Sequence, residues 1–176
     1  KLPYLDGISI SFIKDKQVAF MDFMLGKFDF LSGIDPSFKD ILLTRDGELK
    51  EEYKDKYIFQ KSLFLNTEYL GFLINEDSPF NNKELRQAIS LGIDRASMMK
   101  YLRNSLGYPS FQGFIPPILN PSDSETKYLE YNPQKAKQLL IKSGYLNSEN
   151  KDKITLLTND TYIDLAEFIQ NQLTKI

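Results

Sequence analysis

The middle of the chain constrains the fold most, because its hydrophobic pattern changes from strand-like to helix-like within residues 69–95. Residues 69–74 form an almost continuous aromatic and aliphatic run, typical of a strand that is covered on both faces. A Pro-Phe turn follows, with Asn81 or Asn82 as the expected cap of a helix. The residues of that helix that share one face are Leu85, Ala88, Ile89 and Gly92. Asp94 is expected to cap a second helix, so strand and helix alternate here.

The same alternation extends through the rest of the chain. Further strands are expected over 8–13, 28–31, 57–65 and 153–158. Further helices are expected from Asp15 to about residue 25, over 36–43 and 95–104, between Asn132 and Gly144, and at the end of the chain. Asp160 or Thr161 is the expected cap of that closing helix. The sequence therefore predicts an α/β fold, with a mixed β-sheet flanked by helices in a single domain, residues 1–176.

Cysteine and histidine are both missing, and their absence narrows the possible chemistry. The chain contains no cysteine, which excludes disulfides, thiolate zinc sites and cysteine nucleophiles. It also contains no histidine, which excludes Ser-His catalysis and histidine metal sites. With a net charge of -2 and no run of basic residues, nucleic-acid binding is not expected. We expect no cofactor, no metal site and no catalytic residues.

The ends of the chain suggest a part of something longer. The first residue is Lys, and Ile176 falls in the expected last turn of a helix. No apolar run is long enough to span a membrane, and no stretch resembles a signal peptide. Any export signal or lipid anchor is therefore expected outside this sequence.

Three loops next to expected strand ends are candidate ligand sites, because ligands of open α/β sheets bind where loops and helix N-termini present free backbone groups. They are the turn after Asn75, the loop 111–114 and the loop 159–162. Each also has a purely structural interpretation, as a turn, a packed loop and a helix cap respectively. The residue types alone leave both interpretations open.

Several motifs in order resemble one family across nearly the whole chain. They are Leu5-Asp6-Gly7-Ile8 with Phe23, Gly26 and Asp29; the central string from Tyr69 to Arg95; and Asn132-Pro133 with Ala136, Leu139, Leu140, Gly144 and Tyr145. This set resembles the family 5 extracellular solute-binding proteins, the peptide and nickel class that delivers ligands to ABC importers.

The resemblance implies a fold and a mode of action. The chain is similar to most of the second lobe of a two-lobed, periplasmic-binding-protein-like (type II) fold, truncated before the return to the other lobe. In such a protein the two lobes close over a small solute or peptide ligand, and the loaded form docks on a membrane ABC permease. An extracytoplasmic location, in the periplasm or lipid-anchored at the outer face of the membrane, follows from the same likeness.

The resemblance also implies the positions of ligand contacts. The residues that match the family's cleft are Leu70, Gly71 and Phe72, with Asn159, Asp160 and Tyr162 from the loop 159–162, and Phe114 is a further candidate. Tyr69 joins them as an aromatic wall of the same site. Main-chain groups can hold a peptide backbone, Gly71 allows close approach, and aromatic walls contact many side chains without strong selection. We expect an oligopeptide as the ligand. The chain alone is expected to bind it weakly or not at all, because half of the cavity is missing.

Three other functions stay open at this point. The solute could be an oligosaccharide or a metal chelate. A glycoside hydrolase would need a pair of carboxylates in one cleft, with Asp29, Asp35, Asp77, Glu84, Asp94 and Asp160 as the candidates. A pure interaction module would use the densely charged segment 44–57 as its docking surface.

Overall fold

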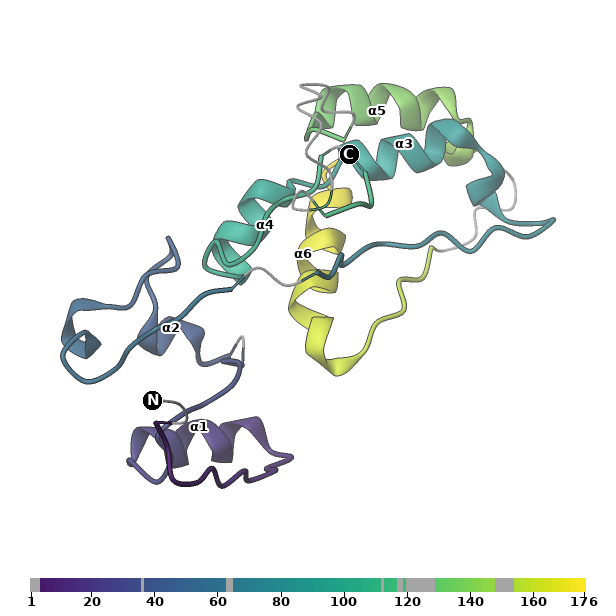
Figure 1. Cartoon of the computed structure of the whole chain (residues 1–176). Coiled ribbons are helices and arrows are strands. Elements are labelled where there is room, and N and C mark those ends of the chain that lie inside the picture. The colour runs from purple at the N-terminus through teal and green to yellow at the C-terminus, as the bar shows by residue number, and fades with distance from the viewer. Residues whose placement is uncertain are drawn as a thin grey trace.

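The computed structural model describes residues 4–35, 37–62, 65–111, 113–116, 119, 129–147 and 154–176. Its α-helices are α1 (Lys16–Met24), α2 (Lys39–Leu42), α3 (Lys83–Leu91), α4 (Arg95–Leu102), α5 (Pro133–Lys142) and α6 (Ile163–Leu173) (Figure 1). Short 3-10 helices are η1 (Glu51–Tyr53), η2 (Pro79–Asn81), η4 (Tyr145–Asn147) and η5 (Asp160–Tyr162). None of the helices in the described part of the chain is long and apolar enough to cross a bilayer.

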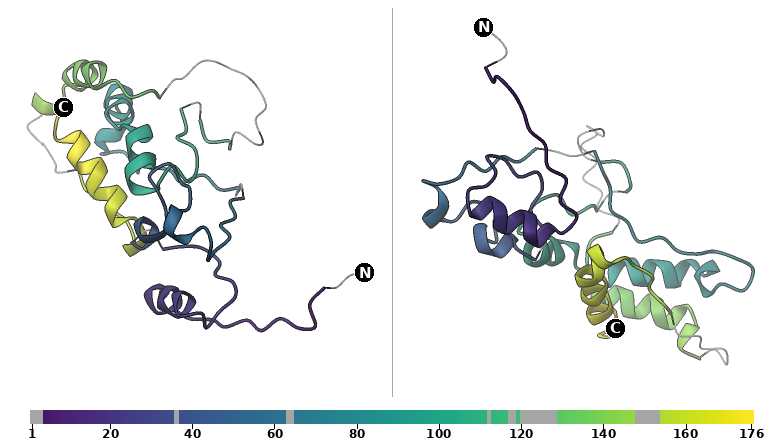
Figure 2. Two further views of the ribbon diagram at one scale, coloured as in Figure 1. Left: turned by 90° about the vertical axis from the view of Figure 1, so that its left-hand side faces the viewer. Right: turned by 90° about the horizontal axis from the view of Figure 1, so that it is seen from below.

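The predicted mixed β-sheet is wrong for the described residues. They contain no β-strand, and their strand-like pairing is limited to an isolated antiparallel bridge between Leu43 and Leu49. The expected strand segments 8–13, 28–31 and 69–74, and the described parts of 57–65 and 153–158, are present as unpaired chain. Figure 2 shows the 4–13 segment projecting from α1 as an extended arm.

The reason for this error is that residue patterns predict the conformation of one segment, whereas a sheet also needs pairing partners. Apolar side chains that a sheet would cover are open to solvent here, with Ile8 78% and Phe12 94% exposed. The accessible surface of 13875 Å² exceeds the about 8,800 Å² that a compact monomer of 20.4 kDa presents. The segments therefore keep strand-like sequences without forming strands.

The N-terminal part of the chain, which carries α1 and α2, is built around a small hydrophobic cluster of Phe20, Leu42 and Leu43. The rings of Phe20 and Phe38 stack with centroids 5.1 Å apart. α1 begins as predicted, because the Asp15 carboxylate accepts hydrogen bonds from the main-chain N–H groups of Gln17 (2.8 Å) and Val18 (3.1 Å).

The C-terminal part of the chain, which carries α3, α5 and α6, is built around a second cluster. The buried members of this cluster are Leu85, Ile89 and Ile93. Partly buried residues from five further segments pack against it: Leu70, Phe72, Phe80, Leu140, Tyr145, Ile169 and Leu173. α3 and α5 lie side by side (Figure 1). The predicted buried face of α3 is confirmed, since Leu85, Ala88 and Ile89 are all buried.

Helix caps in this part were predicted with one exception. Asn82, Asp94 and Asn132 accept hydrogen bonds from Leu85, Ser97 and Lys135 N–H groups at 3.0, 3.0 and 2.9 Å. The prediction of Asp160 or Thr161 as the cap of the closing helix is wrong. Residues 160–162 form η5 instead, and α6 starts after Tyr162 without a side-chain cap.

Candidate functional site

The candidate site is organised around the segment 65–75, which Figure 1 shows as an extended trace leading to η2. Its side chains alternate in their contacts, as expected for extended chain. Leu70 and Phe72 are half-buried against the second cluster, and the Phe72 ring lies 5.1 Å from that of Phe80. The side chains of Leu70 and Phe72 are thus occupied in packing, which leaves their main chain as the part that can meet a ligand.

On the other side of this segment, Tyr69 meets the 113–116 loop. The rings of Tyr69 and Phe114 form an edge-to-face pair with centroids 5.0 Å apart and planes at 62°. The Thr67 hydroxyl donates a hydrogen bond to the Phe114 carbonyl oxygen at 2.9 Å, which fixes the loop to the segment. Both rings remain largely open to solvent, with Tyr69 72% and Phe114 62% exposed. The pair offers a preformed apolar surface.

Gly71 lies on the same side as Tyr69. A Cβ added to Gly71 would sit 3.7 Å from the Tyr69 ring, an ordinary contact distance, so packing alone does not require glycine at this position. The main-chain N–H and C=O groups of residues 69–72 form no hydrogen bond within the described parts of the chain. Such an unpaired extended backbone is a template for another extended chain.

η5 and the residue that caps it, Asn159, supply the remaining candidate residues. Asn159 and Asp160 are exposed, and the Asn159 side chain accepts a hydrogen bond from the Thr161 N–H group at 3.1 Å. The Tyr162 hydroxyl donates a hydrogen bond to Glu68 Oε1 at 3.1 Å. The negative charge of Glu68, and then this hydrogen bond, raise the pKa of Tyr162. η5 is thereby connected to the 65–75 segment.

The structure thus brings two of the candidate residues, Phe114 and Tyr162, to the segment 65–75. Phe114 contacts Tyr69 on one side of the segment, and Tyr162 reaches it through Glu68 on the other. Glu68 is a member of this arrangement that the sequence analysis missed. Its position beside Tyr69 in a strand-like run was the available signal, but its partner lies 94 residues away.

The structural interpretations of two of the loops, and of the charged segment 44–57, also have support. The Ser78 hydroxyl donates to the Leu73 carbonyl oxygen (2.7 Å), and the Asn81 amide donates to the Asn75 carbonyl oxygen (2.7 Å), so the turn after Asn75 is well bonded. Asn159 caps η5. The charged segment 44–57 forms local ion pairs, including Lys54 Nζ to Glu51 Oε2 at 2.6 Å.

Two of the candidate carboxylates, Asp35 and Glu84, show the opposite of what a glycoside hydrolase acid needs. A general acid needs a raised pKa. The pKa of Asp35 is instead lowered, chiefly by hydrogen bonds from the hydroxyl and N–H groups of Ser37. The pKa of Glu84 is also lowered, first by its own main-chain N–H group and then by Lys142. Asp94 is occupied as a helix cap.

Comparison with known proteins gives a consistent set of matches. The family model for bacterial extracellular solute-binding proteins, family 5 Middle, matches residues 1–176. The chain is 27% identical over 176 residues to heme-binding protein A of Haemophilus influenzae, covering 98% of this chain and 30% of that protein. It is 28% identical over 188 residues to the oligopeptide-binding protein AppA of Bacillus subtilis, covering 99% of this chain and 32% of that protein.

A third relative is named for a different ligand. The glutathione-binding protein GsiB of Escherichia coli is 25% identical over 175 residues, covering 99% of this chain and 32% of that protein. The chain therefore spans about a third of the length of these curated relatives. No solved structure matches the chain significantly.

Proposed function

Because the chain belongs to the family 5 bacterial extracellular solute-binding proteins, we propose that it supplies one side of a solute site that a second lobe closes. The proposed solute is a short peptide. In this role the protein performs no chemistry on its ligand. It passes the ligand to an ABC permease and works outside the cytoplasm.

The observation that carries the peptide proposal is the main chain of residues 69–72, which has no hydrogen-bond partner among the described residues. An extended peptide can be held by main-chain hydrogen bonds to such a segment, which gives affinity without selecting one sequence. The exposed ring pair of Tyr69 and Phe114 lies beside this backbone and can contact apolar side chains of the peptide. The similarity to an oligopeptide-binding protein supports the same ligand class.

Charge near the main chain adds a preference to this proposal. Glu68, which is held by Tyr162, places a carboxylate in the segment itself, and Asp160 is exposed two residues before Tyr162. Carboxylates attract cationic groups and repel anionic ones. We therefore propose that peptides with a free amino group or basic side chain bind in preference to acidic ones.

The experiment is native mass spectrometry of the intact protein purified without denaturation, followed by titration with tri-alanine, glutathione and heme. The proposal predicts bound masses that correspond to a mixture of short peptides, and displacement of these peptides by tri-alanine. A single bound heme, sugar or metal chelate that tri-alanine does not displace would show that the solute class is wrong. A variant with Tyr69→Ala and Phe114→Ala tests whether the same site is used, since it should retain less peptide.

A further inference from the structure

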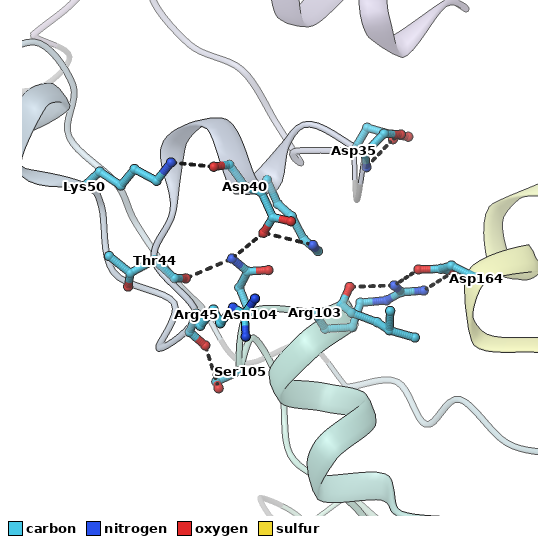
Figure 3. A network of polar contacts seen from close by, with 12 residues as sticks. Asp35, Asp40, Thr44, Arg45, Lys50, Arg103, Asn104, Ser105 and Asp164 are labelled. Atoms are coloured by element: carbon cyan, nitrogen blue, oxygen red, sulfur yellow. Dashed lines mark hydrogen bonds and ion pairs between the residues drawn. The ribbon is translucent and has the colours of Figure 1, made fainter. Parts of the chain in front are cut away.

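One polar connection joins the start of α6 to the end of α4 (Figure 3). Arg103 Nη1 lies 2.5 Å from Asp164 Oδ2, and Nη2 lies 3.2 Å from Oδ1, so the guanidinium grips the carboxylate with two parallel hydrogen bonds. The Arg103 side chain is 14% exposed and Asp164 is 39% exposed. A bidentate, mostly shielded pair fixes orientation better than a solvated pair between flexible side chains.

Arg103 is itself held firmly in place. Its Nη1 also donates to the Leu102 carbonyl oxygen at 2.7 Å. The next two residues, Asn104 and Ser105, have positive φ angles of 47° and 56°, a conformation that non-glycine residues adopt only when their surroundings hold them. These surroundings are visible in Figure 3.

The contacts of Asn104 and Ser105 come from the N-terminal part. The Asn104 amide is buried and donates to Asp40 Oδ1 and to the Thr44 carbonyl oxygen, both at 2.9 Å. The Ser105 hydroxyl donates to the Arg45 carbonyl oxygen at 3.0 Å. The end of α4 is therefore anchored to the segment 40–45, and Arg103 projects from this anchored turn toward α6.

η5 has few other restraints. The preceding described segment, 154–158, makes no main-chain hydrogen bond within the described residues, and α6 starts without a side-chain cap. Asp164 is in the first turn of α6, two residues after Tyr162, so a contact that holds Asp164 also restrains η5. Its acidic side chain is also favourable at a helix N-terminus.

From these contacts we infer that Arg103 is a positioning residue for the candidate ligand site: through Asp164 it places η5 so that Tyr162 reaches Glu68. Arg103 itself need not touch the ligand. This inference rests on the proposed function for its biological meaning, but the placement of η5 can be tested without any ligand.

The test uses 3-fluorotyrosine introduced at position 162 of the intact protein, with its titration followed by ¹⁹F NMR. Two opposite effects make this readout decisive. Contact with Glu68 raises the pKa of Tyr162, whereas the positive charge of Arg103 lowers it. Loss of position and loss of charge therefore move this pKa in opposite directions.

The variants are Arg103→Gln and Arg103→Lys. Arg103→Gln should lower the pKa of Tyr162, because η5 moves away from Glu68. Arg103→Lys should lower it as well, although the charge is kept, because an ammonium group cannot make the bidentate contact. The ¹⁹F resonance at neutral pH should shift in both variants.

Lys142→Met serves as the matched control. This variant removes another ion pair between helices, in which Lys142 Nζ of α5 lies 3.2 Å from Glu84 Oε1 of α3. Neither residue belongs to η5 or to α6. The variant should leave the Tyr162 titration unchanged. If Arg103→Gln raises the pKa of Tyr162, or if Arg103→Lys leaves the pKa and the resonance unchanged, the positioning role is overturned. Circular dichroism checks that helix content is kept, and if Arg103→Gln loses it, Arg103→Lys alone decides.

This result is separate from the result for ligand class. If no peptide binds but the pKa of Tyr162 shifts as predicted, the proposed solute is overturned and the positioning role stands. If peptide binds but the pKa of Tyr162 does not shift as predicted, the positioning role is overturned and the proposed solute stands.

Discussion

The Tyr162 hydroxyl donates a hydrogen bond to Glu68 Oε1, and this 3.1 Å contact joins two segments that are 94 residues apart in the sequence. It connects η5 with the extended segment that carries Tyr69 and Gly71. The positioning role inferred for Arg103 depends on these segments lying together. The contact also makes a prediction about pH.

The Tyr162 pKa is raised above its ordinary value of 10.0 by Glu68. The neutral hydroxyl is the form that donates, so the contact contributes fully to stability below pH 10.0 and is lost as the pH rises through the raised pKa. Glu68→Gln should therefore lower the pKa of Tyr162. Difference titration of the tyrosine absorbance against a Tyr162→Phe variant measures this. Glu76→Gln, directly after the segment 65–75, should have no such effect; an equal shift in both variants would contradict the specific contact.

The ring pair of Tyr69 and Phe114 predicts an energetic coupling. In a double-mutant cycle of Tyr69→Ala and Phe114→Ala, the free energies of unfolding should be non-additive by about 0.5–1.5 kcal/mol. Denaturant unfolding measures the coupling. Tyr108→Ala combined with Phe114→Ala is the control, since Tyr108 is exposed and forms no ring pair in the described residues. Additive free energies for Tyr69 and Phe114 would show that the rings do not interact.

Gly47 is predicted to be intolerant of a side chain. Its φ is +74°, and an added Cβ would lie 2.6 Å from the Asn104 main-chain oxygen. Gly47→Ala should lower the free energy of unfolding by about 2–4 kcal/mol, from strain in the backbone and overpacking together. Gly26→Ala is a matched control, because Gly26 has the same φ of +74° but open space around its Cβ position. Equal losses in the two variants would mean that the contact with Asn104 is unimportant.

Truncation of Leu85 is predicted to destabilise the second cluster. This residue is 1% exposed, and Leu85→Ala should lower the free energy of unfolding by about 2–5 kcal/mol because it leaves a cavity in the core. Leu73→Ala removes the same atoms from a residue that is 76% exposed and should change stability by less than about 0.5 kcal/mol. Thermal and denaturant unfolding compare the two. A similar small loss for both would place the core elsewhere.

The helices were predictable because their signals are local. Asp15, Asn82, Asp94 and Asn132 each cap the helix that directly follows, and every partner lies within three residues. The error at the closing helix is small in comparison, since the loop before it forms the extra turn η5.

The sheet was not predictable from the same kind of pattern. A strand-like run specifies an extended segment, while pairing depends on partners that are distant in sequence. Contacts between distant segments also determine which residues of the candidate site lie together. The sequence placed Tyr69 and Leu70 together in that site, but the alternation of the extended chain sends Leu70 to the cluster and Tyr69 to Phe114. The Glu68–Tyr162 contact could not be predicted either, because its two residues are 94 positions apart in the sequence.

The central claim is that a peptide binds along the main chain of residues 69–72. The most direct measurement is amide hydrogen exchange of this segment in the intact protein, with and without saturating tri-alanine. The account predicts that exchange at residues 69–72 slows when the peptide binds, while exchange in α1 stays unchanged. Saturation with peptide that leaves the exchange of residues 69–72 as fast as before would contradict it.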